Sequence, residues 1–193
     1  HLPVSKSAYL TYIRMEGVIM EFENIKKICS FSVSNWHLIT MLAPYLSKEL
    51  ENGHQICTFF ETDMEEMMEE FLSKLTLNQE TKEQLLNLNW NNNQGYKYAQ
   101  VQEELNKEPN KELLIVVNGN RNYIEKININ IERWVKKNKI KSKISIINCY
   151  EVTQFNNHIK EILDGHHKIL NTSGEKEIEE VFEGYTKNKQ NVI

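Results

Sequence analysis

Short apolar runs that alternate with amphipathic stretches are the feature of this chain that most constrains its fold. The runs at Gln55–Phe60 and 112–117 are almost continuously apolar, and apolar residues also predominate at 143–150, as is typical of strands buried on both faces of a parallel sheet. Between them, apolar residues recur every three or four positions, which is the period of a helix. Strands that alternate with helices predict one α/β domain with a central, mostly parallel, doubly wound sheet and helices on both faces.

The same patterns locate the individual elements. Further strands are expected at 27–33, 85–90 and 168–170, the last at the sheet edge, which makes five or six in all. Helices are expected at 35–50, 63–75, 97–106, 121–138, 155–163 and 175–184. Ser34 or Asn35 can cap the first of these helices, and Asn52–Gly53 can end it. Thr62 and Glu65 have the spacing of a capping box for helix 63–75.

The length of 193 residues suits one domain. We expect that domain at 21–184, between an N-terminal extension (1–20), in which Met20 is a candidate native start, and a C-terminal tail (185–193). No run approaches the roughly 20 apolar residues of a membrane helix. Residues 1–19 also lack the basic start and apolar core of a signal peptide. These observations predict a cytoplasmic protein without a membrane contact.

The cysteines and the charge limit the classes of partner. Cys29, Cys57 and Cys149 are widely spaced and lie in strand-like runs, which predicts buried free thiols. The alternative is a three-thiolate metal site, although the short Cys-x₂₋₄-Cys pairs of zinc sites are missing. The net charge of −4 argues against general nucleic-acid binding.

The first strand-to-helix turn has no phosphate-binding loop. Such a loop needs glycines, whose backbone amides cradle the phosphate, and a lysine that reaches it. Residues 31–37 (FSVSNWH) contain neither, and the bulky Val33 and Trp36 would obstruct the phosphate. The chain also lacks G-x-S-x-G, H-E-x-x-H, C-x-x-C and G-x-G-x-x-G. We therefore expect no catalytic residues, no cofactor, no metal and no ATP hydrolysis at this turn.

In an open α/β sheet, ligands bind at the carboxyl ends of the strands. Amide, aromatic and acidic side chains that gather there can line a pocket for a small ligand. The candidate ligand-binding residues are Ser34, Asn35, Trp36, His37, Glu61, Asn118, Asn120, Tyr150 and Glu151. The alternative is that these residues serve as helix caps and turn residues.

Three other groups of residues favour a structural interpretation. The acidic residues of helix 63–75 form a solvated face above a methionine-lined core face, or alternatively an adaptable partner surface. The basic stretch 133–143 suits a solvated loop after a helix, with a nucleic-acid or lipid contact as the alternative. His166 and His167 follow Gly165 and suit a turn.

The order of elements near the end of the chain resembles the MEDS domain, the methanogen and dichloromethane-repressor sensory domain. The matching residues are a strand that ends in Cys149-Tyr150-Glu151, a helix that Phe155 begins, and His-Lys-Ile-Leu at 167–170. Residues 29–36 (CSFSVSNW), Pro44-Tyr45-Leu46 and 50–53 (LENG) are similar to the beginning of that family. Where that family has a His-Pro turn, this chain has Lys168 in place of the proline.

The resemblance covers roughly residues 24–172 and implies a RecA-like fold without a Walker A motif. It also implies a sensory or regulatory domain in signalling or transcriptional control, which binds a small ligand or a regulatory protein such as a histidine kinase or a transcription factor. The domain would act alone, through a partner or as a homodimer. The alternatives are a nucleotide-binding remnant that no longer hydrolyses ATP and a pure protein-interaction module.

Overall fold

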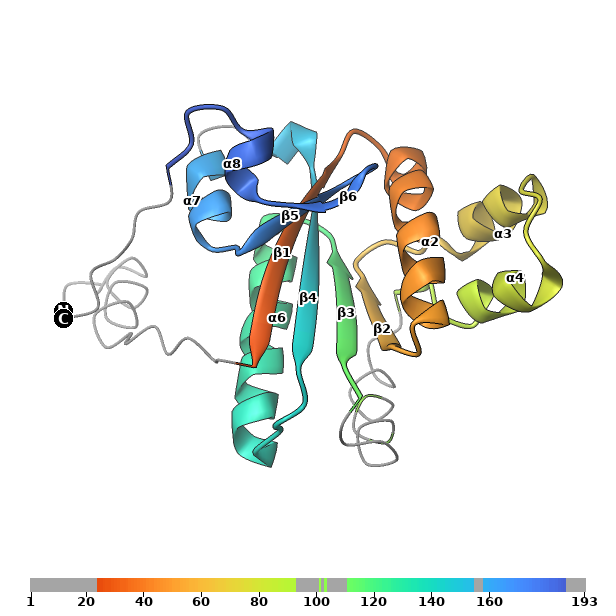
Figure 1. The fold of residues 1–193 in the computed structure, drawn as a ribbon, viewed down its shortest axis with the longest axis horizontal. Coiled ribbons are helices and arrows are strands. Elements are labelled where there is room, and N and C mark those ends of the chain that lie inside the picture. The colour runs from red at the N-terminus through yellow and green to blue at the C-terminus, as the bar shows by residue number, and fades with distance from the viewer. Residues whose placement is uncertain (1–23, 93–100, 102, 104–110, 155–157, 187–193) are drawn as a thin grey trace, which may run out of the picture.

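A sheet of six strands forms the middle layer of the protein (Figure 1). The computed structural model describes residues 24–92, 101, 103, 111–154 and 158–186. The strands are β1 (Ile25–Ser32), β2 (Gln55–Phe60), β3 (Leu113–Asn118), β4 (Ile144–Glu151), β5 (Lys168–Asn171) and β6 (Gly174–Lys176). They lie in the order β2-β3-β4-β1-β5-β6, and every neighbouring pair is parallel except β5 with β6.

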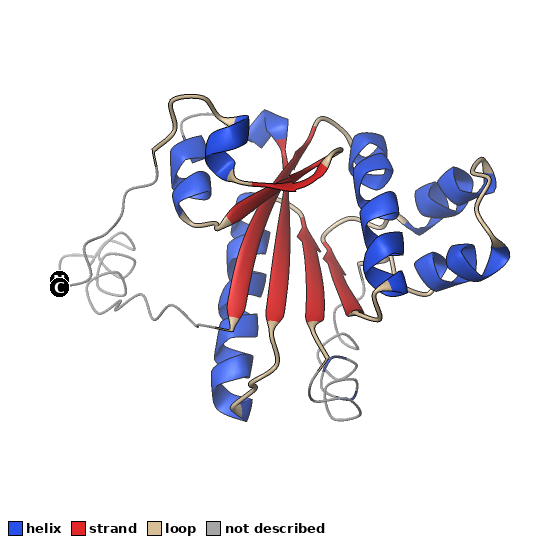
Figure 2. Cartoon of the chain, viewed as in Figure 1, coloured by secondary structure: helices blue, strands red, loops and turns tan. Residues whose placement is uncertain are grey.

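Helices cover both faces of this sheet (Figure 2). The helices α2 (Asn35–Glu51), α3 (Glu65–Ser73) and α4 (Gln79–Leu86) pack against one side, which we call the first face. On the second face lie α6 (Arg121–Asn138), α7 (Ile159–Asp164) and α8 (Ile178–Val181). This arrangement confirms the predicted α/β domain with a mostly parallel sheet between helical layers.

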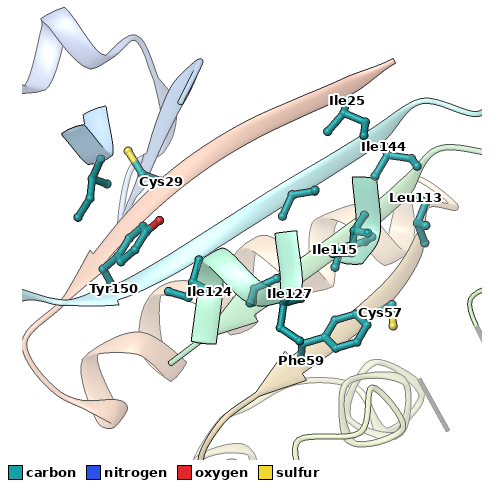
Figure 3. Packing of buried hydrophobic residues seen from close by; sticks show 14 of the residues in the cluster. Ile25, Cys29, Cys57, Phe59, Leu113, Ile115, Ile124, Ile127, Ile144 and Tyr150 are labelled. Atoms are coloured by element: carbon teal, nitrogen blue, oxygen red, sulfur yellow. The ribbon is translucent and has the colours of Figure 1, made fainter. Parts of the chain in front are cut away.

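Alternating residues of the strands supply two hydrophobic cores. In β1, Ile28 belongs to the core of the first face and Cys29 to the core of the second face, because successive side chains of a strand point to opposite sides. Figure 3 shows part of the second core, where Cys29 and Tyr150 from the sheet lie near Ile124 of α6. Burial on both faces explains why β3 is apolar almost throughout.

The chain leaves β1 and β4 in opposite directions. After β1 it enters α2 on the first face and reaches β2, whereas after β4 it passes a short 3₁₀ turn (Val152–Gln154) and α7 on the second face before reaching β5. Because β1 and β4 are neighbours, their carboxyl ends form a topological switch point, which is where open α/β sheets bind ligands. The register places Ser32 directly beside Glu151 at this point.

The helix boundaries follow from local hydrogen bonds, and one predicted cap is wrong. Ser34 caps α2 as expected, since its side chain accepts the backbone N–H of His37, and Gly53 follows the helix with a φ of 78°. The capping box of Thr62 and Glu65 does not form. The carboxylate of Asp63 accepts the N–H of Glu65 instead, at 3.0 Å, and α3 begins at Glu65.

The predicted strand at 85–90 is also wrong. Residues up to Leu86 are helical, and Asn89 has a φ of 61°, which interrupts an extended chain. The hydroxyl of Thr58 hydrogen-bonds the carbonyls of residues 88 and 89 at 2.7 Å. The indole of Trp90 donates to the carbonyl of Leu85 and stacks on Phe60. Leu85 and Trp90 therefore belong to the core of the first face, Leu88 packs against it, and the segment adds no strand to the sheet.

The final predicted helix, 175–184, is replaced by a strand and a shorter helix. Gly174–Lys176 forms β6, which pairs with β5 in the antiparallel sense, so that β6 and not β5 is the edge strand. Helix α8 spans Ile178–Val181 alone. The predicted helix 97–106, the first residues of helix 155–163 and both terminal segments fall wholly or mainly outside the described residues.

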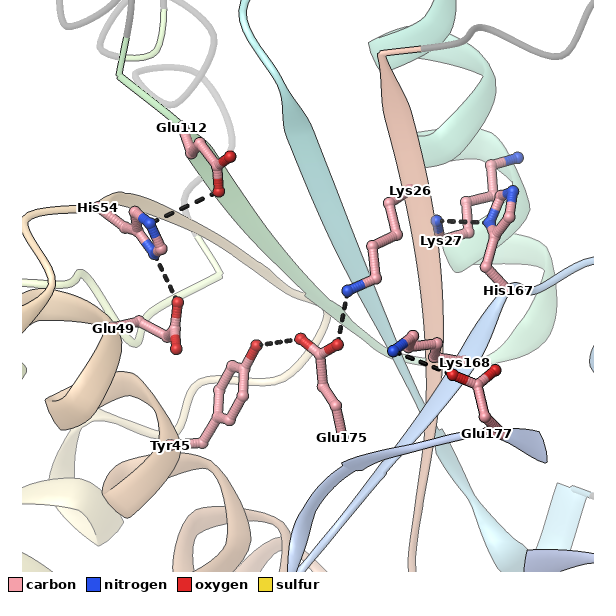
Figure 4. Close-up of polar contacts among 10 residues, drawn as sticks. All are labelled: Lys26, Lys27, Tyr45, Glu49, His54, Glu112, His167, Lys168, Glu175 and Glu177. Carbon is pink, nitrogen blue, oxygen red and sulfur yellow. Dashed lines mark hydrogen bonds and ion pairs between the residues drawn. The ribbon is translucent and has the colours of Figure 1, made fainter. Parts of the chain in front are cut away.

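Polar contacts hold the β6 edge against the first face (Figure 4). The carboxylate of Glu175 accepts a hydrogen bond from the hydroxyl of Tyr45 at 2.7 Å and binds the ammonium of Lys26 at 2.5 Å. These contacts join β6 to α2 and β1. They explain why Glu175 lies in a strand although its surroundings in the sequence are helix-forming. In the part of the chain that the structure describes, no helix is long and apolar enough to cross a membrane.

The three cysteines are buried free thiols, as predicted. Burial raises the pKa of the Cys29 thiol to about 12 and also raises the pKa of Cys149. Because the thiolate is the reactive form, we expect a thiol reagent such as Ellman's reagent to titrate no cysteine at pH 8 in the folded protein. In guanidinium chloride the same reagent should titrate all three. Rapid reaction of a thiol under native conditions would contradict the burial of these residues.

Candidate functional site

The predicted site residues at the start of α2 mainly serve the backbone of their own turn. The side-chain oxygen of Ser34 accepts the N–H of His37 at 3.2 Å, and the imidazole of His37 accepts the N–H of Val33 at 3.2 Å. Asn35 is exposed. Trp36 is 38% exposed, with the ammonium of Lys74 5.4 Å from the centre of its ring. This turn is a capped helix start with one exposed indole.

The predicted residues after β2 and β3 bind one another. The carboxylate of Glu61 accepts the backbone N–H of Asn120 at 2.6 Å and its side-chain amide at 2.5 Å, at the N-terminus of α6. A Cβ atom on Gly119 would lie 2.7 Å from Glu61 Oε2, so only glycine fits between these residues. Asn118 is buried and donates to the carbonyl of Cys149 at 3.1 Å. The carboxylate of Glu61 thus occupies the place at the helix N-terminus that suits an anion.

Tyr150 and Glu151 end β4 but lie in different surroundings. Glu151 is exposed, whereas Tyr150 is 5% exposed and packs on the second face against the rings of Phe31 and His166. Trp36 instead lies beside Lys74, which follows α3 on the first face. The structure therefore separates Trp36 from Tyr150, which the sequence had placed in one candidate pocket.

Tyr150 faces an open pocket on the second face. The pocket has a volume of about 270 Å³ and lies between α6 and α7, above β1 and β4. We call it the α6–α7 groove. Its lining residues are Lys27, Arg121, Ile124, Glu125, Asn128, Ile129, Glu132, Asn148, Tyr150, Glu161, Ile162, Gly165 and His166.

A buried polar network forms the floor of the groove. The side-chain amides of Asn128 in α6 and Asn148 in β4 hydrogen-bond each other at 2.8 and 3.3 Å. The amide of Asn148 also lies 2.9 Å from His166 Nε2, and His166 Nδ1 lies 2.5 Å from the carbonyl of Ile162 in α7. If Asn148 donates to Nε2, then Nδ1 carries the proton and donates to Ile162. All three side chains are at least 94% buried, so the network joins the sheet to both helices that form the groove.

The hydroxyl of Tyr150 is available to a ligand. It makes no hydrogen bond to another residue in the described ranges, although the side chain is almost completely buried and lines the groove. Burial raises the pKa of this phenol well above its ordinary value, so the hydroxyl stays protonated at neutral pH. Because Tyr150 lines the groove, a molecule that binds there could form a hydrogen bond with this hydroxyl.

Charged residues of both signs form the rim of the groove. Arg121 binds Glu125 within α6 and Glu161 of α7, each at 2.7 Å. At the other end, Lys27 of β1 binds Glu132 of α6 at 2.6 Å. The hydrogen bonds from Arg121 and His158 hold the pKa of Glu161 below its usual range, so its carboxylate is charged at neutral pH. The rim therefore offers both signs of charge to a ligand.

Sequence reasoning included Tyr150 but missed the rest of the groove. A signal was present for two of the missed residues, because Asn148 interrupts the apolar run of β4 and Asn128 lies in the apolar stripe of Ile124, Ile127 and Ile131. A polar side chain at a core position needs a partner there. No comparable signal marked Arg121 or Lys27, since charged residues are common on exposed helix and strand positions.

The fold and the groove define a three-layer α/β domain with a polar, solvent-open pocket on one face of its sheet. A scan against protein-family models found no matching family, and searches of curated proteins and of solved structures also found no match. Among the described residues, no group of three or more His, Cys, Asp or Glu side chains is arranged to hold a metal ion.

The polar network gives a prediction about stability. Replacing Asn148 with leucine removes the hydrogen-bond partner of two other buried side chains, Asn128 and His166. We expect Asn148→Leu to lower the free energy of unfolding by about 1–3 kcal/mol, measured by urea denaturation. The control is Asn122→Leu on the exposed side of α6, which should change stability by less than about 0.5 kcal/mol. Equal stabilities for the two variants would contradict the network.

Proposed function

We propose that this chain is a non-catalytic sensory or regulatory domain, of the MEDS kind that its sequence resembles, and that it binds a small ligand in the α6–α7 groove. The observation that carries the proposal is Tyr150, a buried side chain that lines an open pocket and whose hydroxyl makes no hydrogen bond to another described residue. Such a group favours a ligand that can hydrogen-bond it.

The surroundings of Tyr150 support a binding role. Apolar side chains from both helices, Ile124 and Ile162, flank the pocket, and charged groups surround its opening. The pocket thus offers apolar contacts together with polar groups that can orient a small molecule. Tyr150 also lies next to the end of β4, where the connections of β1 and β4 diverge, so the groove adjoins the topological switch point of the sheet.

A regulatory role requires that the ligand shift an element whose position a partner can detect. Helix α7 suits this role because polar contacts that a ligand could replace join it to neighbouring parts of the chain. Glu161 binds Arg121, the carbonyl of Ile162 binds His166, and Asp164 accepts the hydroxyl of Tyr185 at 2.7 Å. A ligand that replaces the contact at Glu161 would therefore influence the position of α7 and, through Asp164, that of the segment that follows α8.

The nucleotide-binding alternative has less support. At the start of α2, the side chains of Ser34 and His37 already satisfy backbone N–H groups of the turn, and at the start of α6 Glu61 occupies the N-terminus. A nucleotide phosphate would have to displace that carboxylate. Neither turn favours a phosphate group.

A protein partner at the switch point is the second candidate. Val33 and Val152 follow the adjacent ends of β1 and β4 and are 65% and 37% exposed, and the exposed Trp36 lies in the next helical turn. Apolar side chains gathered on a surface favour a contact with another protein. This observation supports a regulatory contact that is distinct from the groove.

Tyr150→Phe tests the groove, since it removes one oxygen and preserves the packing of the ring. Ligand-observed NMR with a library of small polar compounds identifies fragments that bind the wild-type protein. In protein-observed spectra, we expect these fragments to shift the backbone amide signals of Gly165 and Asn128. Their affinity should fall about threefold to tenfold in Tyr150→Phe, which is the usual effect of one lost hydrogen bond.

The matched control is Trp36→Phe, which alters an exposed aromatic residue of the other helical layer and should leave these affinities unchanged. Binding that shifts the amides near Val33 and Val152, and that depends on Trp36, would move the ligand to the switch-point surface. The absence of any fragment that shifts the groove amides would contradict the proposal.

A further inference from the structure

The ion pairs at the rim of the α6–α7 groove place positive and negative groups side by side at its opening. The contact of Arg121 with Glu161 joins α6 to α7, and the contact of Lys27 with Glu132 joins β1 to α6. Arg121, Lys27 and Glu132 are each about one-third exposed or less. The carboxylates of Glu161 and Glu125 are 54% and 52% exposed, so the ion pairs of Arg121 are surface contacts that a ligand can open at little cost in free energy.

A ligand with a single charge can pair with only one of the two signs of charge at this rim. An anion that binds Arg121 would displace Glu161 or Glu125 and leave a carboxylate without its partner, and a cation that binds Glu161 would leave the guanidinium without one of its partners. A ligand with both charges can replace both members of an opened pair. The number of charges at the rim does not change, and each charge keeps an opposite neighbour.

We infer that the ligand of the groove is a small zwitterion that carries an ammonium and a carboxylate group, as free amino acids do. This inference rests on the proposed function and specifies the class of ligand. The planar guanidinium of Arg121 is suited to bind the carboxylate of the ligand. Glu161 and Glu125 accept the ammonium group.

The position of Tyr150 agrees with this arrangement. The charges of both Glu125 and Arg121 act on the pKa of its phenol, so the free hydroxyl lies within electrostatic reach of the same pair of charges that would bind the zwitterion. The hydroxyl can donate to the carboxylate of the ligand. The three side chains then contact one end of the molecule, and Ile124 and Ile162 are available to its side chain.

The size of the groove also suits this class. Its volume of about 270 Å³ lies just below the range of roughly 300–1,000 Å³ that is usual for ligand pockets. A pocket of this size holds a molecule of amino-acid dimensions, whereas a dinucleotide is much larger.

Isothermal titration calorimetry of the full chain tests the inference. The probes are the standard free amino acids, first in pools and then one by one. For each amino acid that binds, two blocked forms follow: the N-acetyl derivative, which has no ammonium group, and the amide, which has no carboxylate. We expect at least one free amino acid to bind and both of its blocked forms to bind about tenfold more weakly or worse.

Arg121→Gln and Arg121→Lys connect this preference to the groove. Arg121→Gln should lower the affinity for the free amino acid about tenfold. It should change the affinity for the amide much less, because the amide lacks the carboxylate that Arg121 binds. Arg121→Lys keeps the charge but loses the planar donor pair, and it should give an intermediate loss. Circular dichroism verifies that both variants are folded.

The outcomes separate the class of ligand from the proposed function. One outcome is that fragments shift the groove amides while no free amino acid binds, or while the blocked forms bind as well as the free form. In either case the assignment of a zwitterionic ligand is wrong, and the groove remains a binding site. An amino acid whose affinity is independent of Arg121 and Tyr150 would also overturn the inference. If no compound of any class shifts the groove amides, both proposals fail.

Discussion

The pairing of β1 with β4 is the contact on which the rest of the structure depends. The two strands are in register over their full length, from Ile25 beside Ile144 to Ser32 beside Glu151. This contact joins β1 to a strand more than a hundred residues later in the chain, and it lies in the middle of the sheet. It also brings together two strands whose connections leave on opposite faces. The switch point, the exposed valines that follow it and the groove beneath Tyr150 all result from this one pairing.

On the second face of the sheet, the buried Asn148 of β4 determines how α6 and α7 are placed. A lone asparagine amide in an apolar strand is unfavourable unless its donors and acceptor are all satisfied. Asn128 from α6 and His166 from the turn after α7 satisfy them. The network therefore fixes the separation of the two helices above the strand, and an open groove lies between them. The ion pair of Arg121 with Glu161 also joins α6 to α7, whereas that of Lys27 with Glu132 joins β1 to α6. These contacts lie along the boundaries of the groove.

The sequence was sufficient for elements whose burial pattern is unambiguous. β2 and α6 match their predicted bounds, and β1, β3, β4 and α2 differ by one or two residues, because continuous apolar runs and a sustained helical period leave few alternatives. Errors occur where a tertiary contact overrides local preference. Leu85, Leu88 and Trp90 resemble a strand but fill a core between helices, and Glu175 lies in a helix-forming stretch but is held in β6 by Tyr45 and Lys26. Contacts of that range are not encoded in a local pattern.

The candidate site shows the same limit. A polar residue at the end of a strand can face a ligand or can satisfy the chain's own backbone, and the residue type does not distinguish the two. Ser34, His37, Glu61 and Asn120 all make such internal hydrogen bonds. Polar residues inside apolar runs are more informative, since they are retained at core positions only with a partner. Asn148 and Asn128 lie at such positions, and together with His166 they line the groove. Tyr150 belongs to both groups. It ends a strand, yet it is buried with its hydroxyl open to a pocket, and that combination makes it the residue on which the proposed function depends.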